Sequence, residues 1–245
     1  MRLALALLTL LASHTQPPRS ARELIQAMHD RYAGKWYHTL SFTQHNTKTN
    51  PDGTQEHSTW REYAALPGRL RIDFLPADSG QGYLFRSDSI YVFKHDSLAS
   101  AGPFIHPLLV LGFDVYFSPV DSTVATLAKV PFDLTVMHED TWEGRPVWVV
   151  GAAKGDLHHN QFWVDQERLV FVRMMQAGQR DTASTSESTF DAYQPLAGTW
   201  VSPRVAFSLN GKPVWLEEYV DLVANGALDG AIFDPAKFAV ARPRH

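Results

Sequence analysis

The residues that could perform acid–base or metal chemistry in this chain are its eleven histidines and the carboxylates near them. The densest group is Asp156, His158 and His159. Adjacent residues of a strand point to opposite faces, so His158 and His159 are poorly placed to bind one metal ion. The run from His138 to Asp140 lacks the second histidine, four residues on, that a helix-borne zinc site requires. We therefore expect no metal and no cofactor. An envelope hydrolase or metal-dependent enzyme that uses the Asp156–His159 cluster is kept as the alternative to the binding function derived below.

Covalent catalysis requires a nucleophile in a recognisable local setting, and none of the common settings is present. The sequence has no Gly-x-Ser-x-Gly elbow and no phosphate-binding glycine loop followed by Lys and Ser or Thr. It contains no cysteine, which excludes thiolate zinc sites, iron–sulfur clusters, cysteine nucleophiles and disulfides. Glu217 and Glu218 point apart in a strand pattern, which favours structural roles. The sequence therefore predicts that the protein is not an enzyme.

The apolar and aromatic residues could instead form a binding site for a hydrophobic ligand. Apolar residues make up 44% of the 245 positions, aromatic residues 12%, and seven tryptophans are spread along the chain. Such a composition is typical of an ordered protein with a sizeable core. The formal net charge is −4, which argues against a nucleic-acid partner. No linker and no fixed-period repeat is evident, so we expect one domain.

The first residues predict a signal peptide. Met1-Arg2 precedes an apolar run from Leu3 to Ala12, and small and polar residues follow. The run is shorter than the roughly 20 apolar residues that a transmembrane helix needs. No cysteine follows it, so a lipid anchor on the mature N-terminus is not expected. We predict a cleaved signal peptide at residues 1–16, a mature domain at 17–245 and a periplasmic or otherwise exported location.

The elements that must position any site are one amphipathic helix and a series of short strands. Ser20 and Glu23 form a capping box, and apolar residues follow at helical spacing up to a stop at Gly34. From Trp36 the period changes to two, with turns at residues 50–53, 79–82, 87–89, 165–167 and 210–211. After residue 131 the strands are expected at 134–137, 147–151, 161–164, 169–174, 184–193, 199–209 and 214–223. This pattern predicts about ten or eleven antiparallel strands.

The segment at about 102–131 differs from the strands around it. It contains the apolar stretch 104–113, and residues 119–129 have apolar side chains on one side of a short helix. We predict short helices that form a lid.

Several segments, in their order along the chain, resemble the LolA/LolB-like family of periplasmic lipoprotein-carrier proteins. The strand with Phe42 and Gln44 is similar to the one that opens those proteins. The Asp52-Gly53 hairpin, the strand ending at Pro67 and the aromatic strands around a Ser-Asp turn follow in the family's order. The remaining matching segments are 71–74, 85–93, 144–150, 162–165 and 233–235.

The resemblance implies a mainly antiparallel β fold with a few helices: one strongly bent sheet, or half-open β-barrel, covered by the N-terminal helix and a helical lid. It implies a carrier or sensor that binds a lipid or a lipoprotein acyl chain in an apolar cavity. The expected partners are a lipid or acylated protein and a membrane-associated donor or acceptor, and the protein is expected to be a monomer. A structural interaction module that uses an exposed sheet edge is a third hypothesis.

The predicted cavity wall combines residues of the strands with residues of the lid. Its predicted members are Leu40, Phe42, Trp60, Leu70, Ile72, Phe74, Tyr91, Phe93, Leu108, Leu109, Leu111 and Phe113. A shift of one residue in a strand would move its side chains to the other face. The lipoprotein carrier proper has an arginine just before the proline that ends the second strand, whereas this chain has Leu66 before Pro67. A generic binder of lipids or hydrophobic ligands is therefore expected, rather than a strict lipoprotein shuttle.

Overall fold

The computed structural model describes residues 16–178, 181 and 183–243. The predicted signal peptide lies outside these residues, except for Gln16. Within the described part of the chain, no helix is long and apolar enough to cross a membrane.

Thirteen strands form one antiparallel sheet in the order β6-β5-β4-β3-β2-β1-β15-β14-β11-β10-β9-β8-β7. Neighbouring strands in the first half are also neighbours along the chain, so β1 to β6 form a meander. The long strand β15 returns beside β1 and joins the two halves of the sheet. The strands of this sheet are β1 (Thr39–Thr49), β2 (Gln55–Ala65), β3 (Arg69–Phe74), β4 (Gly82–Arg86), β5 (Ser89–Lys94), β6 (Ser97–Pro103), β7 (Met137–Trp142), β8 (Arg145–Val150), β9 (Gln161–Asp165), β10 (Phe171–Ala177), β11 (Thr185–Asp191), β14 (Arg204–Leu209) and β15 (Lys212–Ala224).

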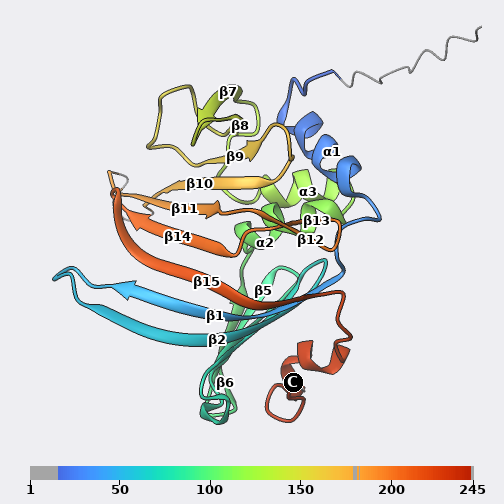
Figure 1. The fold of residues 1–245 in the computed structure, drawn as a ribbon, viewed down its shortest axis with the longest axis vertical. Coiled ribbons are helices and arrows are strands. Elements are labelled where there is room, and N and C mark those ends of the chain that lie inside the picture. Colours follow the sequence, from blue (N-terminus) through green and yellow to red (C-terminus); the bar gives the residue numbers. More distant parts are fainter. Residues whose placement is uncertain (1–15, 179–180, 182, 244–245) are drawn as a thin grey trace, which may run out of the picture.

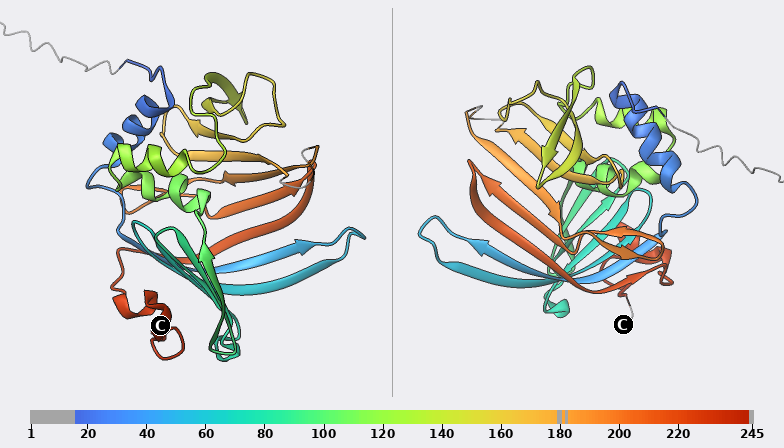
Figure 2. Two further views of the ribbon diagram at one scale, coloured as in Figure 1. Left: turned by 180° about the vertical axis from the view of Figure 1, so that it is seen from behind. Right: turned by 45° about the horizontal axis from the view of Figure 1, so that its top comes forward.

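The sheet is strongly bent but does not close into a barrel. Its end strands β6 and β7 pair on one side only, as far as the described residues show. Figures 1 and 2 show the curved sheet, with the β1–β2 hairpin projecting beyond the helices. The predicted fold class, a mainly antiparallel, half-open sheet with a helical cover, is confirmed.

The strand number was underestimated, and some bounds differ. A separate ribbon of β12 (Gln194–Leu196) and β13 (Thr199–Val201) adds two strands. The strand expected at 134–137 begins only at Met137, because Asp133 accepts hydrogen bonds from the backbone and hydroxyl of Thr135 and holds a turn there. The strand expected at 199–209 is broken at Ser202-Pro203, since proline has no amide hydrogen for the ladder.

The helices form a layer at one end of the concave face (Figures 1 and 2). Helix α1 (Ala21–Tyr32) begins as predicted, with the Ser20 hydroxyl accepting a 3.2 Å hydrogen bond from the Glu23 amide. The Glu23 carboxylate reaches back to the amide of Arg19, 2.8 Å away. The lid segment supplies α2 (Pro107–Gly112), the 3₁₀ turn η2 (Asp114–Tyr116) and α3 (Val120–Leu127), while its first residues complete β6.

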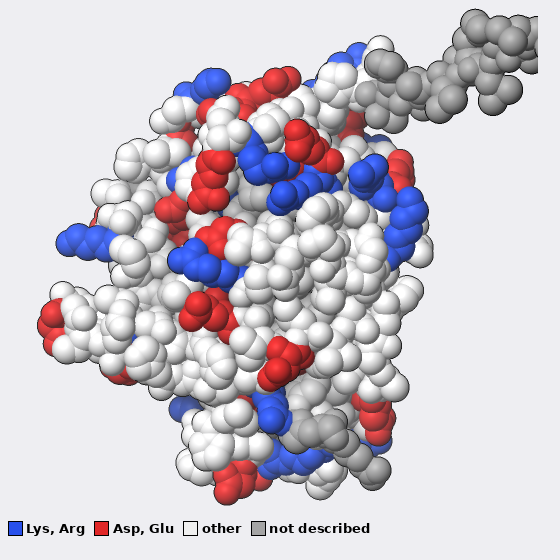
Figure 3. All heavy atoms as spheres, in the orientation of Figure 1, with Lys and Arg blue, Asp and Glu red and all other residues white. Residues whose placement is uncertain are grey.

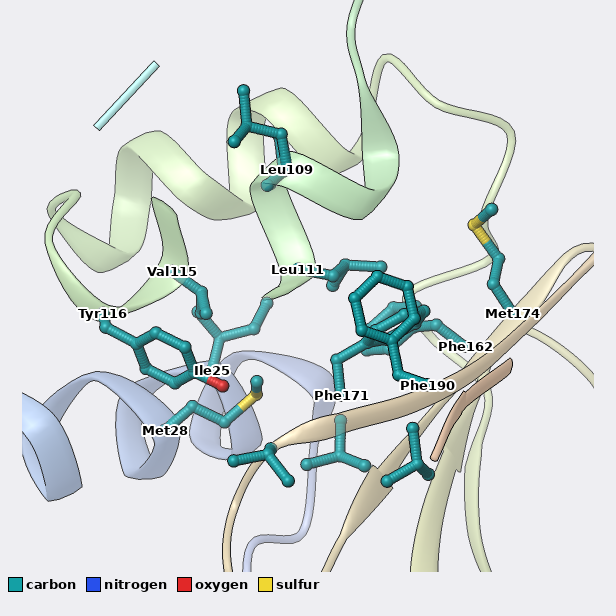
Figure 4. Close-up of a cluster of buried hydrophobic side chains, with 14 of the residues drawn as sticks. Ile25, Met28, Leu109, Leu111, Val115, Tyr116, Phe162, Phe171, Met174 and Phe190 are labelled. Carbon is teal, nitrogen blue, oxygen red and sulfur yellow. The ribbon is translucent and has the colours of Figure 1, made fainter. Parts of the chain in front are cut away.

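The main core lies between this helical layer and strands β8 to β11. Figure 4 shows Ile25 and Met28 of α1 near Val115 and Tyr116. The rings of Trp36 and Tyr116 stack with centroids 3.8 Å apart. This packing fixes the helices against one half of the sheet and leaves the other half of the concave face to a cavity.

The convex face of the first half is covered by the C-terminal segment, which contains the 3₁₀ turns η3 (Gly230–Phe233) and η4 (Pro235–Lys237). Arg71 of β3 is fully buried there and donates hydrogen bonds to the carbonyls of Ile232, Phe238 and Ala241. Its guanidinium also pairs with Asp73 at 2.9 Å and lies 4.1 Å from the centroid of the Phe238 ring. One buried cation thus ties the end of the chain to the sheet.

Candidate functional site

A cavity of about 240 Å³ lies between the concave face and helix α2. It is larger than the ~150 Å³ apolar cavity that admits benzene in an engineered protein. Its wall is formed by strands from both halves of the sheet and by the start of the lid. The lining residues are Leu40, Phe42, Trp60, Glu62, Ala64, Leu70, Ile72, Tyr83, Phe85, His106, Leu108, Leu109, Phe113, Phe190, Phe207, Glu217 and Tyr219.

Strand register explains why these side chains meet. Phe42 of β1 is directly opposite Glu62 of β2, and Glu62 is opposite Ile72 of β3, so the three share one face. Period two then places Trp60 and Ala64 on that face as well. The structure brings eight of the twelve predicted residues to this wall: Leu40, Phe42, Trp60, Leu70, Ile72, Leu108, Leu109 and Phe113.

Two other predicted residues lie beside the cavity rather than in its wall. Phe74 stacks on Trp60 with ring centroids 4.7 Å apart. Leu111 is fully buried in the helix–sheet core. Figure 4 shows Leu111 beside Phe190, whereas Leu109 lies on the other side of α2.

The face assigned to β5 is wrong by one residue. Tyr91 and Phe93 lie on the convex face, where Phe93 stacks on Phe238 with centroids 3.8 Å apart. Ile90 and Val92 therefore point to the concave side, opposite Phe85 and Tyr83 of β4. The sequence was ambiguous here because the C-terminal segment buries the second face, so both sets of β5 side chains are apolar or aromatic.

Nine lining residues were not predicted, and most have a simple signal. Tyr83 and Phe85 alternate on β4, and Glu62 falls between Trp60 and Ala64 on one face of β2. Phe190, Phe207, Glu217 and Tyr219 belong to the second half of the sheet, whose approach to the first half depends on the β1–β15 pairing. His106 belongs to the start of the lid, and the ninth residue is Ala64 itself.

Two carboxyl groups, Glu62 and Glu217, face this otherwise apolar space. Glu62 is only 6% exposed, and no described residue donates a hydrogen bond to its carboxyl group. Burial, together with the charge of Glu217, raises the pKa of Glu62 well above its ordinary value. Burial also raises the pKa of Glu217 to about 7, although its carboxylate accepts hydrogen bonds from the Tyr219 hydroxyl at 2.7 Å and Trp215 Nε1 at 3.2 Å. Neither carboxyl group has a cationic partner in the cavity wall.

Two buried amide side chains of β1 lie on the same face of the sheet as the two carboxyl groups, and we call the four residues the polar strip. Gln44 and Asn46 are 1% and 2% exposed, and Gln44 Nε2 donates a 2.6 Å hydrogen bond to Asn46 Oδ1. Gln44 Oε1 and Asn46 Nδ2 have no partner among the described residues. Asn46 is the register partner of Glu217, and Gln44 is the partner of Tyr219. The concave face of β1 therefore carries two buried polar side chains next to the two carboxyl groups.

His106 contributes a neutral group to the wall. Its Nδ1 accepts a 3.3 Å hydrogen bond from the amide of Leu109 and so caps helix α2. Burial lowers the pKa of His106 to about 4, which keeps the ring uncharged at neutral pH. The lining residues include no Lys and no Arg. The charge of the site therefore depends on Glu62 and Glu217.

The Asp156–His159 cluster lies in a loop outside the cavity wall. His159 Nδ1 and Asp156 Oδ2 are 2.5 Å apart, and the His159 side chain is 76% exposed. Asp156 Oδ1 also accepts hydrogen bonds from the amides of His158 and His159, which shapes a local turn. Across the ranges that the structure describes, no three His, Asp or Glu side chains are grouped so that they could hold a metal ion.

No protein-family model matches the sequence, and comparison with curated proteins gives no match. Solved structures do match over most of the chain. A putative outer-membrane lipoprotein-sorting protein domain from Vibrio parahaemolyticus aligns with a TM-score of 0.62 and 15% identity, over 89% of this chain and 97% of that one. A LolA superfamily protein from Nitrosomonas europaea aligns with a TM-score of 0.57 and 12% identity, over 88% and 98%. A DUF1329 family protein from Desulfovibrio piger aligns with a TM-score of 0.59 and 15% identity, over 87% and 95%.

The fold is LolA-like. The resemblance found in the sequence is thus confirmed at the level of the fold. The position before Pro67 holds Leu66, so it supplies no basic group. The Leu66 side chain is buried in the main core and does not line the cavity.

Proposed function

We propose that the protein is an exported, non-enzymatic carrier that holds the apolar chain of a lipid or acylated protein in the cavity beneath α2. The observation that carries this proposal is the cavity itself, whose wall is mostly aliphatic and aromatic. Removing an alkyl chain from water contributes about 0.8 kcal/mol for each buried methylene. An apolar wall can therefore retain a chain without specific chemistry.

The solved structures with this fold support the choice of cargo. One is described as a lipoprotein-sorting domain and another as a LolA superfamily protein. An exported carrier agrees with the signal peptide predicted at residues 1–16. Figure 3 shows acidic and basic side chains interspersed on one face of the molecule, in keeping with the net charge of −4. The proposed carrier therefore has no nucleic-acid partner. The carrier acts as a monomer that receives cargo from a membrane-associated donor and delivers it to an acceptor.

Extraction of the purified protein tests this proposal. The full chain of residues 1–245 is expressed, so that its own N-terminal segment is present, and the exported protein is purified without detergent and extracted with organic solvent for mass spectrometry. We expect a co-purifying lipid or saturable binding of the uncharged probe N-phenyl-1-naphthylamine after delipidation. A protein that yields no lipid and binds no probe would refute the carrier function.

A further inference from the structure

The polar strip in the cavity suggests which head group the cargo carries, an inference that rests on the proposed function. Glu62 and Glu217 reach the cavity from β2 and β15, the two neighbours of β1. They share the concave face with Gln44 and Asn46 of the strand between them. Of the four groups, Glu62 and Glu217 line the cavity, whose wall is otherwise apolar apart from His106 and Tyr219, and the two buried amides lie beside it on β1.

Hydrogen-bonding capacity is left over in the polar strip. The Glu62 carboxyl group accepts no hydrogen bond from the described residues, although the residue is only 6% exposed and so has little access to water. Gln44 Oε1 is a second acceptor and Asn46 Nδ2 a donor, and both are buried without a partner in the described chain. Buried polar groups are normally satisfied, and leaving one unpaired costs free energy. The two unpaired amide atoms are one acceptor and one donor, and the Glu62 and Glu217 carboxyl groups add further acceptor oxygens at the cavity wall. A ligand group with several donor hydrogens would therefore find partners here.

The charge balance narrows the choice of donor. A carboxylate or phosphate head group would lie beside Glu62 and Glu217 with no Lys or Arg in the cavity wall to compensate it. The neutral ring of His106 offers no positive charge either. A primary ammonium group carries one positive charge and three donor hydrogens, so it can bond to both carboxyl groups and, by its charge, favours their ionised forms.

We propose that the Glu62–Glu217 pair is the head-group subsite of the cavity and that it selects a single-chain amphiphile with a primary ammonium group. The alkyl chain lies against Leu70, Ile72 and Leu109, and the ammonium group lies between the two carboxyl groups. This selectivity is opposite to that of a fatty-acid carrier.

Competition binding with matched twelve-carbon ligands tests the selectivity. Each ligand is titrated against delipidated protein with bound N-phenyl-1-naphthylamine at pH 7.5, and displacement of the probe is measured. The three ligands are dodecylamine, dodecan-1-ol and dodecanoate, each kept below its micelle concentration or its solubility limit. We expect dodecylamine to bind about 10- to 100-fold more tightly than dodecan-1-ol, the range expected for a desolvated charge pair, and dodecanoate to bind more weakly than either.

Variants separate the subsite from the apolar wall. E62Q and E217Q keep the side-chain shape and should reduce the amine-over-alcohol preference, measured as the ratio of the two affinities in the same variant, to less than about threefold. E218Q is the matched control, because Glu218 is the next residue of β15 and is exposed on the other face. It should retain the full preference. Circular dichroism confirms that each variant is folded.

The outcomes distinguish this inference from the proposed function. Dodecanoate binding as tightly as dodecylamine, or an amine preference that persists in both Gln variants, overturns the ammonium subsite while binding of dodecan-1-ol still supports a carrier. Binding of none of the three ligands overturns both proposals.

Discussion

Glu62 of β2 and Glu217 of β15 face the same cavity from either side of strand β1, and the charge of Glu217 helps to raise the pKa of Glu62. They are far apart in the sequence and meet because β15 returns to pair with β1. A purely structural core would favour apolar residues at both positions, because a carboxylate removed from water without a cationic partner is costly. The return of β15 beside β1 therefore brings two carboxyl groups into one cavity.

Filling the cavity should abolish binding without unfolding the protein. Ala64 lines the cavity on β2, so Ala64→Leu places a larger side chain in its space. We expect the affinity for N-phenyl-1-naphthylamine to fall at least about tenfold, with a loss of stability below about 2 kcal/mol because the cavity accommodates the added atoms. Fluorescence titration and urea unfolding measure the two effects. Ala99→Leu, at an exposed alanine of β6, is the control and should bind as the wild type does.

The carboxyl pair should make stability decrease as the pH rises. The pKa of Glu217 is about 7 in the folded state and near 4.5 in the unfolded chain, so the folded state binds the proton more tightly. Its contribution is complete below pH 4.5 and is lost between about pH 4.5 and 7, at a cost of about 3 kcal/mol. E217Q should lack this loss.

Comparison of variants is needed because other groups also titrate. His106 has a lowered pKa of about 4, so it reduces stability as the pH falls below about 6.5. Asp114, with a pKa raised to about 6, acts in the same direction as Glu217. Urea unfolding of the wild type and E217Q from pH 4.5 to 8 isolates the Glu217 contribution by difference. A constant difference across that range would show that Glu217 titrates normally.

Arg71 should contribute strongly to stability and not to binding. Arg71→Met removes a fully buried cation, leaves Asp73 buried without its partner and frees three carbonyls of the C-terminal segment. We expect a loss of about 3–5 kcal/mol and faster proteolysis near residues 230–243. Lys94→Met, at an exposed basic residue of β5, is the control and should cost less than about 1 kcal/mol. Equal effects of the two variants would contradict the anchoring role.

The two faces of the β4–β5 hairpin should respond differently to truncation. Phe93→Ala removes the stacking contact with Phe238 on the convex face, so it should reduce stability by about 3 kcal/mol and leave probe affinity unchanged. Phe85→Ala opens the cavity wall and should change probe affinity. The affinity of each variant for N-phenyl-1-naphthylamine is measured by fluorescence titration at a temperature where both variants are folded. Weaker binding in Phe93→Ala alone would restore the original face assignment.

Local signals in the sequence were sufficient for much of the fold. The capping box at Ser20 and Glu23 located helix α1, and Asn210-Gly211 located the β14–β15 turn. Alternation also placed Leu40, Phe42, Leu70 and Ile72 on the cavity side. These features depend on residues close together in the chain.

The errors have nonlocal causes. Tyr91 and Phe93 were assigned to the wrong face because Phe238, far along the chain, covers the convex side. The carboxyl pair has no local signal, because Glu217 adjoins Glu218 in the sequence, whereas Glu62 is far from both. Only the pairing of β1 with both β2 and β15 brings those two residues to one cavity.

Isotope-filtered nuclear Overhauser spectroscopy of the mature protein with bound dodecylamine tests the central claim most directly. The carrier account predicts contacts between the ligand methylene protons and the methyl groups of Leu70, Ile72 and Leu109, which line the cavity. Contacts confined to exposed residues such as Leu98 and Val223, with none to the cavity wall, would contradict it.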